Sequence, residues 1–235
     1  MSFSIISTII ACTLAGVVVS IWKKSQTAVR AEYIREYTFP PGLFDKLRNK
    51  RPELTLKDCQ LASHALRQFF LAYLKSGCKF VSMPSQVADD LWHELILYTR
   101  HYELFCNKAF GRFMHHTPAI VLTADKQGNT GLRRCWWYAC KEENINPKAP
   151  TRLPLLFALD SKLKVADGFI YQPDCKSLGN HQGGGNGSVY CGGDFSSDNF
   201  DGSTAGFGDG SSGDGGSDGD AGGGDGGCGG GCGGD

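Results

Sequence analysis

The sequence predicts a mainly α-helical protein with a single N-terminal transmembrane helix, a small α-helical domain and a disordered glycine-rich tail. Three observations lead to this prediction: an uncharged apolar stretch at the N-terminus, helical spacing of apolar residues through the middle, and a C-terminal segment dominated by glycine. We expect the membrane anchor to cover residues 1–24, the helical domain 30–175 and the tail 180–235.

The N-terminal stretch has the length and the flanks of a membrane anchor. Residues 2–22 carry no charge, and as a helix they would span about 32 Å, which matches a hydrocarbon core of about 30 Å. Trp22, Lys23 and Lys24 stand where interfacial aromatic and positive residues belong. A signal peptide would have a positive start and a shorter apolar core. The pattern favours a single-pass anchor, with the body and the tail in the cytoplasm.

The first helices of the body are marked by helix start and stop residues. A short helix follows a proline pair and is expected to end near Pro52. The next helix begins at Thr55, which forms with Asp58 a weaker relative of the capping box. It is expected to end at Gly77, because glycine is the preferred residue just past a helix.

The following stretch predicts one long helix. Its candidate N-cap is Ser82, and the helix is expected to continue without interruption to Phe110, where Gly111 ends it. A fourth helix is expected over 130–143, and then a short helical turn and an extended stretch that ends near Tyr171. No strand pattern elsewhere is long enough to predict a sheet.

The tail differs from the body in composition and charge. Residues 183–235 hold 24 of the 32 glycines, and the stretch from Cys191 onward has 9 Asp and no Lys or Arg. Before Cys191 the chain has 24 basic and 15 acidic residues. Such a tail buries too little to offset its backbone entropy, so we expect it to be disordered. Its cysteines, Cys228 and Cys232, would be open to metal, oxidant or another chain.

A basic body is typical of proteins that bind nucleic acid, but the sequence lacks the motifs of such proteins. It has no basic run, no zinc-finger spacing and no aromatic RNA-binding motif. The expected partners are therefore the membrane and an unidentified protein, and no cofactor is predicted. The remaining cysteines are expected to be free thiols with packing roles in a reducing compartment.

The most unusual stretch lies on the predicted long helix. On a helical wheel its apolar residues form one core face, made of Val87, Leu91, Leu95, Tyr98, Tyr102, Phe105 and Ala109. Asp89, His93 and Arg100 form a row on the opposite side, bordered by Trp92. A carboxylate one turn before a histidine can hold the imidazole in one tautomer or stabilise its charged form.

The stretch ADDLWHELILYTRHYELFCNKAFGRFMHHTP resembles the signature of the glycine-rich domain-containing protein family. In that family an Asp-x-x-Trp-His block is followed by a tyrosine, a pair ending in cysteine, and a histidine. The matching positions are Asp89, Trp92, His93, Tyr102, Phe105, Cys106 and His116. The resemblance covers residues 80–175 and the composition of the tail. It implies an architecture and no reaction, because the family has no established one.

Two functions are compatible with these features. The first is a non-enzymatic interaction module that presents a flexible acidic tail and a polar cluster to a partner. That cluster comprises Asp89, Trp92, His93, Arg100 and His116. The alternative is a metal-binding domain or metal-dependent hydrolase built on Asp89, His93 and the pair His115 and His116, since zinc uses such ligands.

A distance argument favours the first of these functions. If the helix runs to Phe110, His93 lies about 26 Å back along the helix axis, whereas the six further residues to His116 reach about 20–22 Å. His116 could share a site with His93 only if the helix broke early, near Asn107. The interaction module is therefore the preferred prediction, with no catalytic residue and no metal ligand assigned.

Overall fold

The computed structural model of the protein describes residues 2–116, 126–173 and 189–191. Within them the chain forms seven α-helices and two short strands, so the prediction of a mainly helical protein is confirmed. In chain order the elements are α1 (Ser2–Glu36), α2 (Leu43–Lys50), α3 (Leu56–Lys75), α4 (Gln86–Ile96), α5 (Thr99–Phe110), α7 (Lys126–Glu142), α8 (Leu155–Leu163), β1 (Ile170–Gln172) and β2 (Val189–Cys191).

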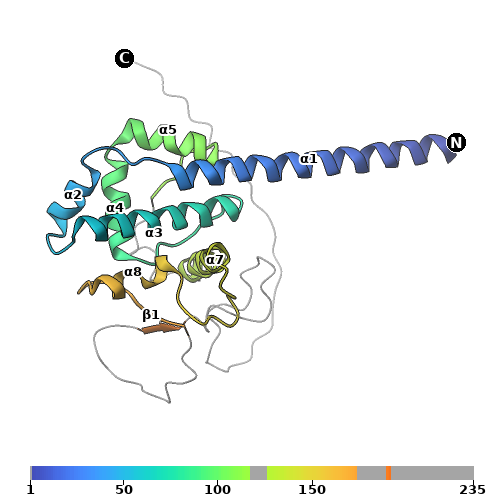
Figure 1. The fold of residues 1–235 in the computed structure, drawn as a ribbon. Helices are drawn as coiled ribbons and strands as arrows, with labels where there is room; N and C mark the ends of the chain where they lie inside the picture. Colours follow the sequence, from blue (N-terminus) through green and yellow to red (C-terminus); the bar gives the residue numbers. More distant parts are fainter. Residues whose placement is uncertain (1, 117–125, 174–188, 192–235) are drawn as a thin grey trace.

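Helix α3 is the centre of the body. It contacts α1, α2, α4, α7 and α8, and in Figure 1 it lies between α1 and α5 on one side and α7 and α8 on the other. The core around it is rich in aromatic rings, of which the largest fully buried ones are Trp136, Tyr102, Phe69, Phe70, Phe105 and Phe157. Burial of such side chains stabilises the fold by about 1.5–3 kcal/mol each.

Helix α1 joins the predicted anchor to the body without a break. It contains an 18-residue window with a mean hydropathy of 1.8, so it is long and apolar enough to cross a membrane, a criterion that a signal sequence also meets. Its N-terminal part projects away from the body (Figure 1). Its last turns pack into the body, where Ala31 and Ile34 are buried and Arg30 donates to the carbonyl of Phe110 at 3.0 Å.

The start of α3 is where the sequence predicts it. The backbone N–H of Asp58 donates to the hydroxyl of Thr55 at 3.2 Å, and the backbone N–H of Thr55 donates to the Asp58 carboxylate at 2.9 Å. These two bonds complete a capping box. The end of α3 also agrees, since Gly77 follows it with a left-handed φ of +75°.

The prediction of one uninterrupted helix up to Phe110 is wrong. Helix α4 ends at Ile96, and α5 begins at Thr99 in a new direction (Figure 1). The bend is held by Tyr98, whose hydroxyl donates to the carbonyl of Pro41 at 3.1 Å and whose ring lies under the ammonium group of Lys46. Both contacts come from a segment more than fifty residues earlier, so tertiary packing overrides the local helical pattern.

The predicted start of that helix also needs correction. Ser85, and not Ser82, is the N-cap of α4, and its side chain accepts from the backbone N–H of Ala88 at 3.1 Å. Ser82 lies in the connection before the helix, which passes close to Gly131 of α7. The helix therefore begins one turn later than the sequence predicts.

The two strands form a small parallel pair in which Tyr171 is opposite Tyr190. Residues 189–191 belong to the segment expected to be disordered, and the structure corrects that expectation at these three positions. They read Val-Tyr-Cys, and both Val and Tyr favour the strand conformation. The rest of the tail prediction, including Cys228 and Cys232, lies outside the described residues. Four of the described cysteines are buried free thiols: Cys59, Cys106, Cys135 and Cys140.

Candidate metal centre

The first turn of α4 is fixed by a carboxylate from α8. The hydroxyl of Ser85 donates to Asp160 at 2.6 Å, and the backbone N–H groups of Gln86 and Val87 donate to the same carboxylate at 2.8 and 3.3 Å. The backbone N–H of Phe169 adds a fourth bond at 2.9 Å. A negative charge at a helix N-terminus is favourable. Asp160 therefore sets the position of the turn that carries Asp89.

Three potential metal ligands converge beside this turn. Asp89 and His93 lie one turn apart on α4, with Nδ1 of His93 3.5 Å from the Asp89 carboxylate. Nε2 of His116 lies 2.9 Å from the other oxygen of Asp89. The rings of His93 and His116 are 4.1 Å apart between centroids. One ligand atom from each of the three residues lies within 4.8 Å of the others.

This arrangement corrects the distance argument made from the sequence. That argument assumed a straight helix to Phe110, which would have kept His116 away from His93. The bend after Ile96 turns α5 aside, and α5 then ends at Gly111, which has a left-handed φ of +72°. The chain after the helix can therefore return to α4.

A buried hydrogen-bonded chain holds the returning segment in place. The indole N–H of Trp92 donates to the hydroxyl of Tyr102 at 3.1 Å, and that hydroxyl donates to the carbonyl of Met114 at 2.6 Å. The Trp92 ring also packs edge-on against His116, with 4.6 Å between centroids. Tyr102 thus fixes the backbone two residues before His116, and Trp92 orients the imidazole.

The geometry of the cluster suits a small divalent ion. Zinc held tetrahedrally by nitrogen and oxygen at about 2.0–2.2 Å has its ligand atoms roughly 3.4 Å apart. The separations of 2.9 and 3.5 Å, which are measured to the two different oxygens of Asp89, bracket that value, and one ligand atom from each residue lies within 4.8 Å of the others. The side chains of Asp89 and His116 are 11% and 12% exposed, whereas that of His93 is 43% exposed. The cluster is therefore enclosed on one side and open to solvent on the other.

Electrostatics favours a neutral imidazole at His93. Burial lowers the pKa of this side chain, and the neighbouring His116 and Lys50 lower it further, against the opposing effect of Asp89 and Asp90. Neutral imidazole is the form that coordinates a metal. Asp90 itself is buried and ion-paired with Lys50 and Arg51. Asp89, by contrast, is paired with His93 and His116.

The predicted site residues do not all come together. His116 contacts Asp89, Trp92 and His93, and His93 also contacts Asp89. Arg100 lies beyond the bend, is exposed on α5 and is not part of the row in which the continuous helix placed it.

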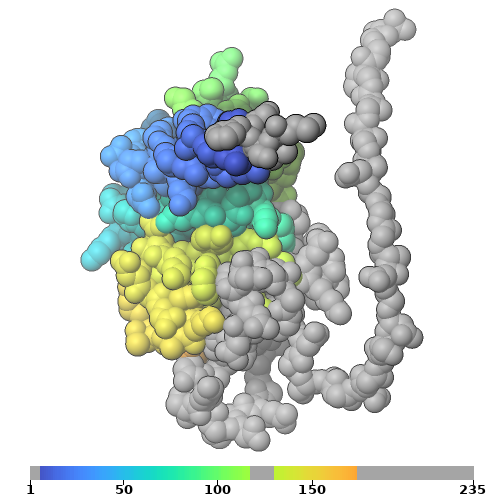
Figure 2. Space-filling model, turned by 90° about the vertical axis from the view of Figure 1, so that its right-hand side faces the viewer, coloured from blue at the N-terminus to red at the C-terminus, as the bar shows by residue number. Residues whose placement is uncertain are grey.

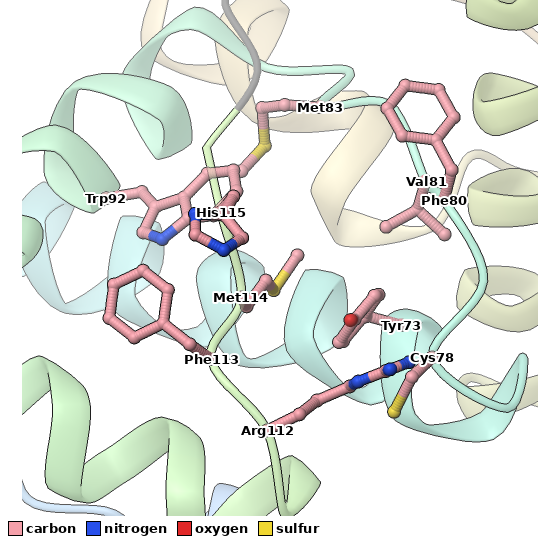
Figure 3. Close-up of a pocket in the computed structure, with 10 residues that line it drawn as sticks. All are labelled: Tyr73, Cys78, Phe80, Val81, Met83, Trp92, Arg112, Phe113, Met114 and His115. Atoms are coloured by element: carbon pink, nitrogen blue, oxygen red, sulfur yellow. The ribbon is translucent and has the colours of Figure 1, made fainter. Parts of the chain in front are cut away.

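His115, which the metal hypothesis included, is separate from the ligand cluster. It is exposed and is one of the residues that line a neighbouring cavity (Figure 3). Two supporting residues were not predicted for the site. Tyr102 was assigned to the core face and to the resembled signature, but not to the polar cluster. Asp160 was not singled out, because no local pattern links it to α4.

A comparison with known families identifies the group to which the body belongs. A family model described as UCP032817-like matches residues 29–195, well over half of the chain. The chain is a member of the UCP032817-like family. The resemblance to the glycine-rich domain-containing protein family is therefore wrong. No curated protein and no solved structure matches the chain.

The limits of the UCP032817-like match agree with the architecture. The match begins just before Ala31 and Ile34, where α1 enters the core, and it ends shortly after β2. It excludes the apolar part of α1 and most of the glycine-rich tail. The candidate metal centre lies wholly inside the family region.

Proposed function

We propose that this protein is a membrane-anchored metal-binding protein, in which Asp89, His93 and His116 hold one zinc ion. The observation that carries the proposal is the return of His116 to the α4 pair, 2.9 Å from Asp89 and 4.1 Å from His93 between ring centroids. Two histidines and a carboxylate from separate segments form a recognised zinc ligand set.

The ligand count points to an ion with a free coordination position. Three protein ligands are typical of zinc sites that also bind water or substrate, whereas structural sites have four. The exposed edge of His93 gives solvent access to such a position. Asp90, which follows Asp89 in sequence, is engaged by Lys50 and Arg51 and so is not available as a general base. Our proposal therefore extends to metal binding and not to hydrolysis.

This proposal reverses the order of the two functions considered from the sequence. The interaction module was preferred because a straight helix separated His93 from His116, and the bend after Ile96 removes that reason. A protein partner remains a prediction. If the cluster binds no metal, its hydrogen-bonded carboxylate is a structural polar cluster and the interaction module again becomes the preferred function.

We also propose that α1 spans the membrane once, with the body in the cytoplasm. The support is the charge of its C-terminal flank, where Lys23, Lys24 and Arg30 follow an uncharged apolar stretch. A cysteine introduced at Ser2 should react with an impermeant maleimide in intact cells, and the native Cys228 and Cys232 should react only after lysis. The opposite labelling pattern would reverse the orientation.

The metal proposal is tested on the full-length protein in a neutral detergent. Elemental analysis after dialysis against trace zinc should find about one ion per chain, because the three ligands form a single site. Most of this bound zinc should be lost in each of the variants His93→Gln, His116→Gln and Asp89→Asn. The matched control is His115→Gln, which changes the adjacent histidine and should keep the ion.

Two results would contradict the metal proposal. One is a wild-type protein that takes up no zinc above the level of a chelator-treated blank. The other is equal zinc loss in His115→Gln and His116→Gln. Thermal unfolding of each variant without metal separates loss of a ligand from loss of the fold.

A further inference from the structure

A second feature of the body is a cavity of about 500 Å³ beside the metal centre. It lies between the end of α3, the connection that leads to α4 and the segment after α5 (Figure 3). Its described lining residues are Tyr73, Cys78, Phe80, Val81, Met83, Trp92, Arg112, Phe113, Met114 and His115. The volume falls in the range of about 300–1,000 Å³ that is usual for sites of small organic ligands.

The cavity is lined by polar and apolar groups in about equal measure, and its one strong cation is the exposed Arg112. Arg112 is the only Lys or Arg among the described lining residues, and Figure 3 shows its side chain extending toward Cys78 and Tyr73. Within the described part of the chain, no carboxylate forms an ion pair with it. A guanidinium without a carboxylate partner is suited to bind a phosphate or carboxylate group with two parallel hydrogen bonds.

The cationic end of the cavity is close to α1. Arg30 of α1 donates to the carbonyl of Phe110, and its guanidinium lies against Gly111, the residue before Arg112. Both arginines act electrostatically on Cys78 at the cavity wall, where they counter the effect of burial on the pKa of its thiol. Two positive groups therefore stand at the same end of the cavity.

If α1 is the anchor, this end of the cavity faces the membrane. Trp22 stands at the expected end of the hydrocarbon-spanning part of α1. Arg30 comes eight residues later, or about 12 Å further along the helix. The polar headgroup layer occupies roughly the first 5–8 Å beyond the hydrocarbon core, so in an untilted helix Arg30 lies about 4–7 Å outside that layer, at the membrane surface. Figure 2 views the body from the side toward which α1 projects in Figure 1. Phe80 and Phe113, two of the lining residues, are exposed to solvent.

We propose that this cavity binds an anionic phospholipid from the bilayer that holds α1. The lipid phosphate pairs with Arg112, and part of an acyl chain lies along the apolar wall that includes Phe80, Met83 and Met114. A lipid fits better than a free anion because the cation shares the cavity with the apolar side chains of Phe80, Met83 and Met114, and better than a neutral amphiphile because the one strong cation is available. The choice of a bilayer lipid as the ligand rests on the proposed membrane anchor.

The test uses dihexanoyl phosphatidylglycerol, an anionic short-chain lipid, added below its micelle concentration to the full-length protein in a neutral detergent. Calorimetric titration should show saturable binding. Dihexanoyl phosphatidylcholine has the same chains but no net charge, and it should bind at least about tenfold more weakly, the effect of about 1.4 kcal/mol from one charged contact. Inorganic phosphate alone should bind more weakly still.

Substitutions test whether the preference for the anionic lipid arises in the cavity. Arg112→Gln should remove the difference between the two lipids, and Arg112→Lys should keep part of it. Arg100→Gln, an exposed arginine of α5 outside the cavity, is the matched control and should behave as wild type. Zinc content measured on the same samples should stay at the wild-type level in Arg112→Gln. A failed metal proposal is thereby distinguished from a failed lipid proposal.

Three outcomes would overturn the lipid proposal. Equal binding of the two lipids to wild type would mean that the cavity does not select an anion. Unchanged selectivity in Arg112→Gln would place the anion elsewhere. Phosphate that binds as well as the anionic lipid would make the site one for a free anion.

Discussion

The carboxylate of Asp160 should be one of the largest single polar contributions to the stability of the body. It is buried and accepts four hydrogen bonds, three of them from the first turn of α4 and the last from Phe169. Replacement by alanine removes the negative charge at the N-terminus of α4, a loss of about 0.3–2 kcal/mol. It also leaves buried N–H donors without a partner, at about 1–3 kcal/mol each.

Together these effects predict that Asp160→Ala destabilises the protein by about 3–5 kcal/mol, allowing for some entry of water. The measurement is urea unfolding of the full-length protein in detergent, followed by far-ultraviolet circular dichroism. The matched control is Asp58→Ala, which removes the capping carboxylate of α3 at an exposed position and should cost about 1 kcal/mol. If the two variants lose equal stability, Asp160 does not anchor α4 as described.

Three further predictions concern other parts of the body. Tyr102→Phe should lower the free energy of unfolding by about 1–3 kcal/mol, because a buried indole N–H and a carbonyl lose their shared partner. It should also weaken zinc binding, which titration with a fluorescent zinc chelator would measure. Unchanged zinc affinity would contradict the positioning role of Tyr102. Glu142 is buried, which raises its pKa, but hydrogen bonds from two basic side chains outweigh this and lower the pKa below the ordinary 4.5. Its contribution to the stability of the fold is therefore complete above pH 4.5 and is lost as the pH falls through the lowered pKa. Glu142→Gln should destabilise the protein at pH 7 and weaken the dependence of its stability on pH in the acid range. Urea midpoints measured from pH 7 to pH 3 would test this. Gly131→Ala should lower the thermal midpoint of unfolding, because its new Cβ would lie 2.8 Å from the backbone nitrogen of Ser82. The control is Gly16→Ala, whose Cβ would have no other atom within 4 Å. Equal midpoints for the two variants would refute the argument.

The features that sequence reasoning predicted correctly depend on neighbours in the chain. The capping box of Thr55 and Asp58 joins residues three positions apart, and a left-handed Gly77 follows α3 as expected. The juxtaposition of Asp89 and His93 follows from the same kind of reasoning, because residues four apart meet on a helix. In each case the local spacing determines the contact.

The features that sequence reasoning missed depend on residues far apart in the chain. The bend at Tyr98 is held by Pro41, 57 positions earlier, and no helix-breaking residue marks it. The start of α4 depends on Asp160, which lies 75 positions after Ser85. The return of His116 follows from the bend, so one missed contact was enough to make the metal site seem impossible. Only the three-dimensional packing reveals these contacts.

The central claim is that Asp89, His93 and His116 bind zinc, and zinc-edge X-ray absorption of the loaded full-length protein tests it most directly. The account predicts a first shell of nitrogen and oxygen at about 2.0–2.1 Å, with the outer scattering of two imidazole rings and no sulfur. In His116→Gln the contribution of one imidazole should disappear. A sulfur shell at about 2.3 Å would place the ion on cysteines and contradict the claim.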